Sequence, residues 1–153
     1  MEKSNIESLC FEFFREFSRY EYCLKATQPK YQDGNAMANW DLFAKDVEQV
    51  FASSKDSDFI AAIDYFTKHP PKKQVVKNGA LEWDANPLEE RSVALKMFVL
   101  IRRVRNNLFH GGKFNGKWFE PERSEALMKH ALVILKICGQ SHPDVSKAYA
   151  DKA

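Results

Sequence analysis

A basic segment in the second half of the chain, residues 102–117, combines side chains that can move protons with side chains that attract anions. It reads RRVRNNLFHGGKFNGK and holds five Lys/Arg residues and no Asp/Glu. The imidazole of His110 can take and give a proton near neutral pH. The guanidinium of Arg105 carries several donors and does not deprotonate, and the amide of Asn106 could orient the imidazole ring. Such a local positive patch could attract phosphate.

A simpler explanation exists, because arginines at a helix C-terminus complement the helix dipole and cap free carbonyls. A helical wheel at about 100° per residue nevertheless separates two stripes in this region. The polar stripe contains Arg102, Asn106 and His110 at i, i+4 and i+8, and Arg105 lies on the flank between the stripes. The apolar stripe contains Met97, Ile101, Val104 and Leu108. The polar side chains are therefore expected to point away from the core.

The run from Arg105 to His110, RNNLFH, resembles the R-x(4–6)-H motif of HEPN-domain proteins, in the variant where a polar residue, here Asn106, follows the arginine. HEPN domains are small helical bundles whose motif lies near the end of a late long helix, with one helix after it. The resemblance therefore extends over residues 4–140. The longer run RNNLFHGGK most resembles small stand-alone members carried on plasmids and other mobile elements.

Many HEPN proteins are endoribonucleases that need no metal ion, so the resemblance implies an RNA substrate and no cofactor. His110 would act as general base or acid at the ribose 2′-hydroxyl. Arg105 would hold the scissile phosphate and stabilise the transition state, and Asn106 would position the histidine or the phosphate. The expected products are a 2′,3′-cyclic phosphate and a 5′-hydroxyl. The surrounding basic residues would bind the RNA: Arg102, Arg103, Lys113 and Lys117.

HEPN nucleases typically work as dimers in which two motif copies share one cleft. Arg105 and His110 lie about 140° apart on an ideal helix, so a second protomer, or unwinding at Gly111-Gly112, would be needed to bring them together. We therefore expect a symmetric homodimer with a composite site. The resemblance further implies a toxin or an effector of defence against phages, with a cognate antitoxin or inhibitor as a candidate partner. Some HEPN toxins carry a tyrosine two residues after the histidine, and Gly112 at this position argues against silencing by modification of such a tyrosine.

Two other classes of function compete with the nuclease. One is a non-catalytic HEPN module that binds RNA, nucleotide or a protein partner, and the other is a plain helical dimerisation domain. The presence of Arg105, Asn106 and His110 together favours the nuclease. The four histidines show no metal-ligand spacing, so no metal is expected, and the usual glycine-rich nucleotide loops are absent. Some aromatic residues could stack bases but more often pin loops to the core: Trp83, Phe114, Trp118 and Phe119. Lys72, Lys73 and Lys77 are most simply solvated lysines.

The elements that carry this segment are predicted to form one all-α domain, residues 1–153 with a core at about 4–140, built as an up-and-down bundle of about five helices. Ser4 opens the first helix with a capping box, and Pro29 and residues 33–35 follow its end. The second helix carries Phe43, Val47, Val50 and Phe51 on one face. Asp56 or Ser57 caps the third helix, whose apolar face is Phe59, Ile63 and Phe66.

Beyond the third helix, Pro70-Pro71 leads into a short hairpin at residues 72–85, turned at Asn78-Gly79. The fourth helix is expected from Pro87 to Gly111-Gly112, and a turn at Asn115-Gly116 leads to the last helix, from Pro121 to Gly139. Cys10 and Cys138 fall in apolar-periodic runs and are expected in the core. The chain shows no secretory signal and no run long enough to span a membrane, which predicts a cytoplasmic protein.

Overall fold

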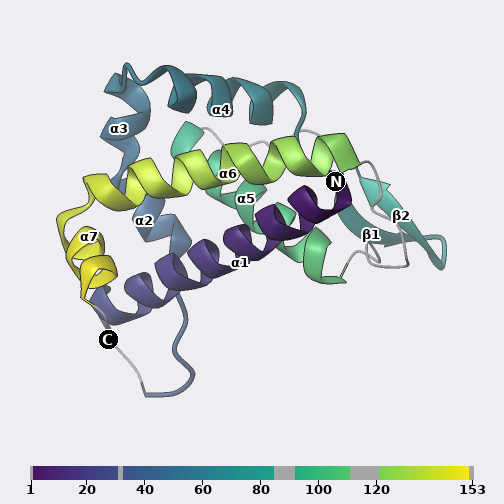
Figure 1. Ribbon diagram of the computed structural model, residues 1–153. Helices are drawn as coiled ribbons and strands as arrows, with labels where there is room; N and C mark the ends of the chain where they lie inside the picture. Colours follow the sequence, from purple (N-terminus) through teal and green to yellow (C-terminus); the bar gives the residue numbers. More distant parts are fainter. Residues whose placement is uncertain (1, 31–32, 85–91, 111–120, 152–153) are drawn as a thin grey trace.

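The computed structural model describes residues 2–30, 33–84, 92–110 and 121–151. Within these ranges the chain forms seven helices and one antiparallel two-stranded sheet (Figure 1). The elements are α1 (Glu2–Thr27), α2 (Trp40–Asp46), α3 (Glu48–Ser53), α4 (Ser57–Lys68), β1 (Lys73–Lys77), β2 (Ala80–Asp84), α5 (Val93–His110), α6 (Pro121–Ser141) and α7 (Pro143–Ala150). The prediction of an all-α fold with a short hairpin is therefore confirmed.

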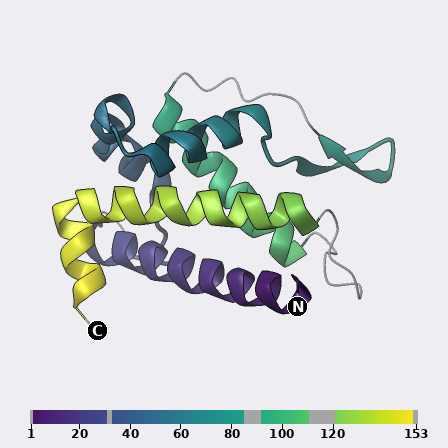
Figure 2. The same ribbon diagram turned by 45° about the horizontal axis from the view of Figure 1, so that its top comes forward.

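Helix α6 lies between α1 and α4, and α5 crosses behind them (Figures 1 and 2). Helices α1 and α6 run in the same direction, although about a hundred residues separate them in the sequence. Helix α4 runs antiparallel to α6, and the ring centres of Tyr65 and His130 lie 4.8 Å apart with the rings tilted by 30°. Large apolar side chains fill the space between the helices, and the largest fully buried ones are Phe13, Phe43, Phe59, Phe66 and Phe98.

Helices α4 and α5 run in the same direction (Figure 2). The ring of Phe51, just before α4, lies 6.0 Å from that of Phe98 in the first half of α5. At the other end, Arg103 in the second half of α5 donates to the carbonyl of Pro71, just after α4. The alternation expected of an up-and-down bundle is thus interrupted between these two helices.

The N-terminal half of the chain corrects two predictions. Helix α1 already includes Glu2, so Ser4 lies inside the helix and is not its N-cap. The single second helix is split into α2 and α3 at Val47, whose φ of −105° and ψ of 11° are not helical. Val47 remains 2% exposed. The break thus keeps this apolar side chain in the core while the chain changes direction.

Two local signals in the next segment are confirmed. The Oδ1 atom of Asp56 accepts from the backbone N–H of Phe59 at 2.9 Å, which caps α4. Asn78 and Gly79 have φ values of 54° and 76°, as a type I′ turn requires. The strands pair from Lys73 opposite Asp84 to Lys77 opposite Ala80.

Helix α5 begins later than predicted. Ser92 precedes the helix, and its hydroxyl accepts from the backbone N–H of Leu95 at 3.2 Å, so α5 starts at Val93. The predicted start at Pro87 lies outside the described residues, as do Gly111-Gly112 and the predicted turn at Asn115-Gly116. His110 is the last described residue of the helix.

Helix α6 begins at Pro121 as predicted but continues to Ser141, because Gly139 lies within the helix. A Cβ atom at Gly139 would overlap the ring of Tyr20, so glycine here allows α1 and α6 to pack closely. The chain then forms α7, which the sequence analysis did not predict. The Nδ1 atom of His142 accepts from the backbone N–H of Val145 at 3.3 Å and caps this helix.

The three cysteines, Cys10, Cys23 and Cys138, are buried and free, which confirms Cys10 and Cys138 as core residues. Of the helices that the structure describes, none has the length and apolar character needed to cross a membrane.

Candidate functional site

Arg105 and Asn106 lie next to each other on the last two turns of α5 and are hydrogen-bonded. The Nη1 atom of Arg105 donates to Oδ1 of Asn106 at 2.7 Å. The guanidinium carbon of Arg105 lies 5.7 Å from the ring centre of Phe17 on α1 and 5.8 Å from that of Phe109. Arg105 is half-buried, and its cation–π contact with Phe17 joins it to α1, whereas Asn106 is exposed.

His110 occupies the final position of α5, four residues after Asn106. Because four residues are about one helical turn, the backbone of His110 continues the helix face that carries Asn106. Lys113 and Lys117, which were predicted to bind RNA, lie outside the described residues.

Three side chains of α5 and α6 hold the base of the hairpin. The backbone carbonyls of residues 70, 71 and 72 accept, in that order, from Nη2 of Arg123 at 2.6 Å, Nη1 of Arg103 at 3.2 Å and Nδ2 of Asn107 at 2.7 Å. Proline lacks an N–H, so residues 70 and 71 offer only acceptors. The hairpin is thus anchored to the bundle by donors from the helices.

Arg103 therefore has a structural contact in addition to its predicted role in RNA binding. It is half-buried, and burial lowers the pKa of its guanidinium, an effect that the nearby carboxylate of Asp84 opposes. Because an arginine keeps its charge well above neutral pH, Arg103 remains a cation beside the hairpin.

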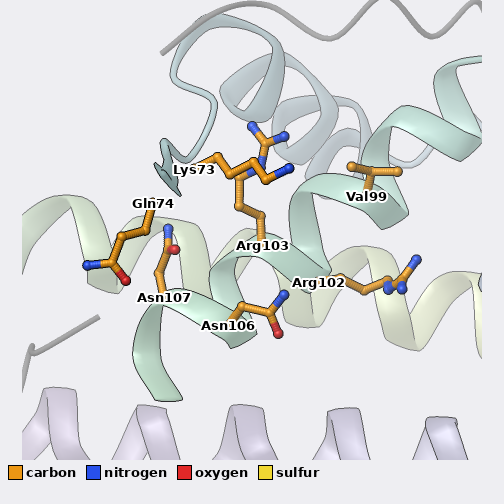
Figure 3. A pocket seen from close by; sticks show the side chains of 7 residues that line it. All are labelled: Lys73, Gln74, Val99, Arg102, Arg103, Asn106 and Asn107. Atoms are coloured by element: carbon orange, nitrogen blue, oxygen red, sulfur yellow. The ribbon is translucent and has the colours of Figure 1, made fainter. Parts of the chain in front are cut away.

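A groove of about 490 Å³ separates β1 from the exposed face of α5 (Figure 3). Its described lining residues are Lys73, Gln74, Val99, Arg102, Arg103, Asn106 and Asn107. Three of these are cations and none is an acid, so the groove suits an anionic ligand. Arg102 and Asn106, both predicted from the sequence as site residues, are brought together here with Arg103.

Sequence reasoning missed the wall of the groove that β1 forms. Lys73 was interpreted as an ordinary solvated lysine, and Gln74 carried no signal. The carbonyls of Pro71 and Lys72 lie 32 and 35 residues from their donors on α5, Arg103 and Asn107, and no local pattern reveals that they meet. Trp83, considered as a base-stacking residue, lies half-buried on β2 opposite Gln74. Phe114, Trp118 and Phe119 lie outside the described residues.

A second polar cluster lies at the opposite end of the bundle, where α7 packs on α1. Glu16 is only 6% exposed, and the hydroxyl of Tyr149 lies 2.8 and 2.7 Å from its two carboxylate oxygens. The guanidinium of Arg19 covers the ring of Tyr149 at 3.9 Å and donates to its backbone carbonyl at 3.0 Å. Tyr20 stacks on Tyr149 with ring centres 4.9 Å apart. These groups satisfy one another and join α7 to the bundle.

No group of three or more His, Cys, Asp or Glu side chains in the described ranges is arranged to hold a metal ion. No protein-family model matches the chain, and comparisons with curated proteins and with solved structures find no match.

Proposed function

We propose that this protein is an endoribonuclease of the HEPN type, which cleaves RNA without a metal ion to give a 2′,3′-cyclic phosphate and a 5′-hydroxyl. The observation that carries the proposal is the Arg105–Asn106 hydrogen bond, one turn before His110 and at the edge of a cationic groove. The residues of the R-x(4–6)-H motif thus lie at the end of a long helix beside a surface that suits a polyanion.

Each motif residue has a distinct role in the proposed reaction. His110 takes the proton of the ribose 2′-hydroxyl, whose oxygen attacks phosphorus. The bond from phosphorus to the 5′-oxygen breaks, and this oxygen receives a proton from a protonated histidine of the composite site or from water. A guanidinium has five N–H donors, so the bond from Arg105 to Asn106 leaves others for the phosphate oxygens, where negative charge grows.

The arrangement of the helices supports a HEPN-like bundle as part of this proposal. The motif lies at the end of the long helix α5, and the long helix α6 follows it. The hairpin and α7 are then additions to the bundle, and the shared direction of α4 and α5 is a departure from simple alternation.

A symmetric homodimer with a composite site is also part of the proposal. The ring of Phe109 is 65% exposed beside Arg105 and meets Phe14 edge-on at 5.5 Å. Phe11, one turn away on α1, is 68% exposed. Exposed aromatic side chains next to a catalytic motif suit a protein interface, and a second copy would supply the residues that one helix holds about 140° apart.

The proposed setting is a cytoplasmic toxin or an effector of defence against phages, controlled by a cognate antitoxin or inhibitor. Expression of the wild-type protein in bacteria should then slow growth, and expression of a His110→Ala variant should not.

The direct test is cleavage of single-stranded RNA by the purified chain in EDTA. The wild type should release fragments that end in a 2′,3′-cyclic phosphate, and His110→Ala should lower the rate by at least about 100-fold, the scale of general acid–base catalysis. His69→Ala is the matched control, because His69 is exposed and follows α4. It should leave the rate unchanged.

Cleavage that survives His110→Ala, or that requires a divalent ion, would contradict the mechanism. RNA that is bound but not cut would instead identify a non-catalytic binding module.

A further inference from the structure

The groove between β1 and α5 contains cationic groups that no described residue neutralises by a direct ion pair. Lys73 and Arg102 make no hydrogen bond or ion pair with any residue in the described ranges, whereas Arg103 and Asn107 use one donor each to hold the hairpin. Asp84 lies opposite Lys73 in the strand register and influences Arg103. Among the described residues, three lining cations outnumber this carboxylate, which leaves the groove positive.

The polar groups of the groove follow the axis of α5 in a definite order (Figure 3). Arg102 extends on the side of Val99, and Lys73 and Arg103 project together from the two walls. The amide of Gln74 points away from these cations and lies on the side of Asn107. On α5 the two cations, Arg102 and Arg103, therefore precede the two amides, Asn106 and Asn107, and the amides lie nearer to His110 along the helix.

The size and spacing of the groove fit one nucleotide. About 490 Å³ lies within the usual range of small-molecule sites. Arg102 precedes Asn106 by four residues, and Asn106 precedes His110 by four, which corresponds to about 6 Å along the axis for each step. Steps of this size are comparable to the distance between successive phosphates of an extended RNA strand.

We propose that this groove binds the nucleotide next to the scissile phosphate, with Lys73 and Arg102 on its phosphate group and the amide of Gln74 on the edge of its base. This inference rests on the proposed ribonuclease function, because His110 defines which phosphate is scissile. It makes the hairpin a specificity element and Gln74 a specificity-determining residue, since an amide offers both a donor and an acceptor to a base edge.

Charge favours RNA over a protein as the occupant. The described lining has a single apolar side chain, Val99, whereas the core of a protein interface is rich in aromatic and apolar groups. Proteins that bind single-stranded RNA contact its phosphates with cationic side chains and its base edges with hydrogen-bonding groups such as amides, and the groove offers both kinds of group.

The first test separates binding from catalysis by using the full chain with His110→Ala as background. Binding of a fluorescein-labelled single-stranded RNA is measured by anisotropy over a series of salt concentrations. Lys73→Ala and Arg102→Ala should each weaken binding by roughly five- to tenfold and lower the slope of log K against log salt by about 0.7. Lys77→Ala is the matched control, since Lys77 is an exposed lysine on the same strand that does not line the groove, and it should leave both quantities unchanged.

The second test uses the active chain and maps cleavage positions in an RNA of mixed sequence. Gln74→Ala should alter the preference for the base beside the cleaved bond by roughly fivefold. Gln49→Ala, an exposed glutamine on α3, should preserve the wild-type preference.

The outcomes distinguish the two proposals. If the wild type binds RNA through Lys73 and Arg102 but does not cut it, the ribonuclease proposal fails and the groove remains an RNA site. If His110 is required for cleavage but Lys73→Ala and Arg102→Ala behave like Lys77→Ala, the groove inference is overturned and the ribonuclease stands. An unchanged base preference in Gln74→Ala would remove Gln74 from the site.

Discussion

The two ends of the bundle use polar side chains in opposite ways. At the α7 end, formed by α1, α6 and α7, the carboxylate of Glu16 is buried and bonded to the hydroxyl of Tyr149, and Arg19 and Tyr20 cover the same ring. At the hairpin end, formed by α5, β1 and β2, Lys73 and Arg102 are exposed and line the groove. Polar groups that satisfy one another stabilise a fold, whereas polar groups held in place but left facing a groove are available to a ligand.

The largest effect on stability should come from Gly139→Ala at the α7 end. The new methyl group overlaps the ring of Tyr20, which is stacked on the ring of Tyr149. The free energy of unfolding should fall by about 2 kcal/mol from this overpacking, although alanine favours a helix by about 1 kcal/mol. Urea denaturation followed by circular dichroism measures the change.

Gln140→Ala is the control for this substitution, because Gln140 is the exposed neighbour on the same helix, and it should have little effect. If Gly139→Ala is as stable as the wild type or more stable, the ring of Tyr20 moves aside freely. The α7 end would then not be tightly packed, as the comparison between the two ends assumes.

A smaller effect is expected for Tyr149→Phe, which removes the donor to a buried carboxylate. Leaving Glu16 without this hydrogen bond should lower the free energy of unfolding by about 1–2 kcal/mol at neutral pH. In a Glu16→Gln background the same substitution should lower the free energy of unfolding by less, since no buried charge then loses its hydrogen-bond donor. Equal losses in both backgrounds would show that the ring contacts, not the carboxylate, hold α7.

The Tyr149 hydroxyl should also make the free energy of unfolding depend on pH. Burial raises the pKa of Tyr149, and the hydrogen bond to Glu16 and the negative charge of the Glu16 carboxylate raise this pKa further. The folded state therefore keeps this proton to a higher pH than the unfolded chain does. The contribution to stability is present below about pH 10, is lost as the pH rises above it, and should be missing from Tyr149→Phe.

The smallest effect on global stability should come from Asn107→Ala at the hairpin end. Removal of one hydrogen bond to the carbonyl of Lys72 should lower the free energy of unfolding by at most about 1 kcal/mol, because Arg103 and Arg123 still hold the hairpin. Hydrogen exchange of the β1 and β2 amides should nevertheless become faster. Asn5→Ala, an exposed asparagine on α1, serves as the control for helix propensity. Unchanged exchange in Asn107→Ala would show that this side chain does not tether the hairpin.

Local signals account for the parts of the molecule that sequence reasoning predicted correctly. The cap at Asp56 and the turn at Asn78-Gly79 depend on neighbouring residues only, and so does the apolar stripe that makes α5 a helix. Helix α7 was missed because its short run buries a single side chain, Val145, and shows no long periodic pattern.

The candidate site was predictable only on the helix that carries the motif. The polar stripe of α5 placed Arg102 and Asn106 on one exposed face, where the structure has them. The opposite wall, Lys73 and Gln74, depends on where the hairpin folds back, and the engagement of Arg103 with Pro71 depends on the same long-range contact. Such contacts are decided by tertiary packing, which no spacing within one helix encodes.

The anchoring of the hairpin has a consequence for how the protein could change over evolutionary time. Its base is held through the carbonyls of residues 70–72 by three side chains, Arg103, Asn107 and Arg123, and none of these belongs to the main apolar core. Substitutions at these three positions can therefore change the orientation of the hairpin while the packing of the helices is preserved. Since one wall of the groove can change independently of the helical bundle, natural selection could alter the ligand specificity of the groove without changing the fold.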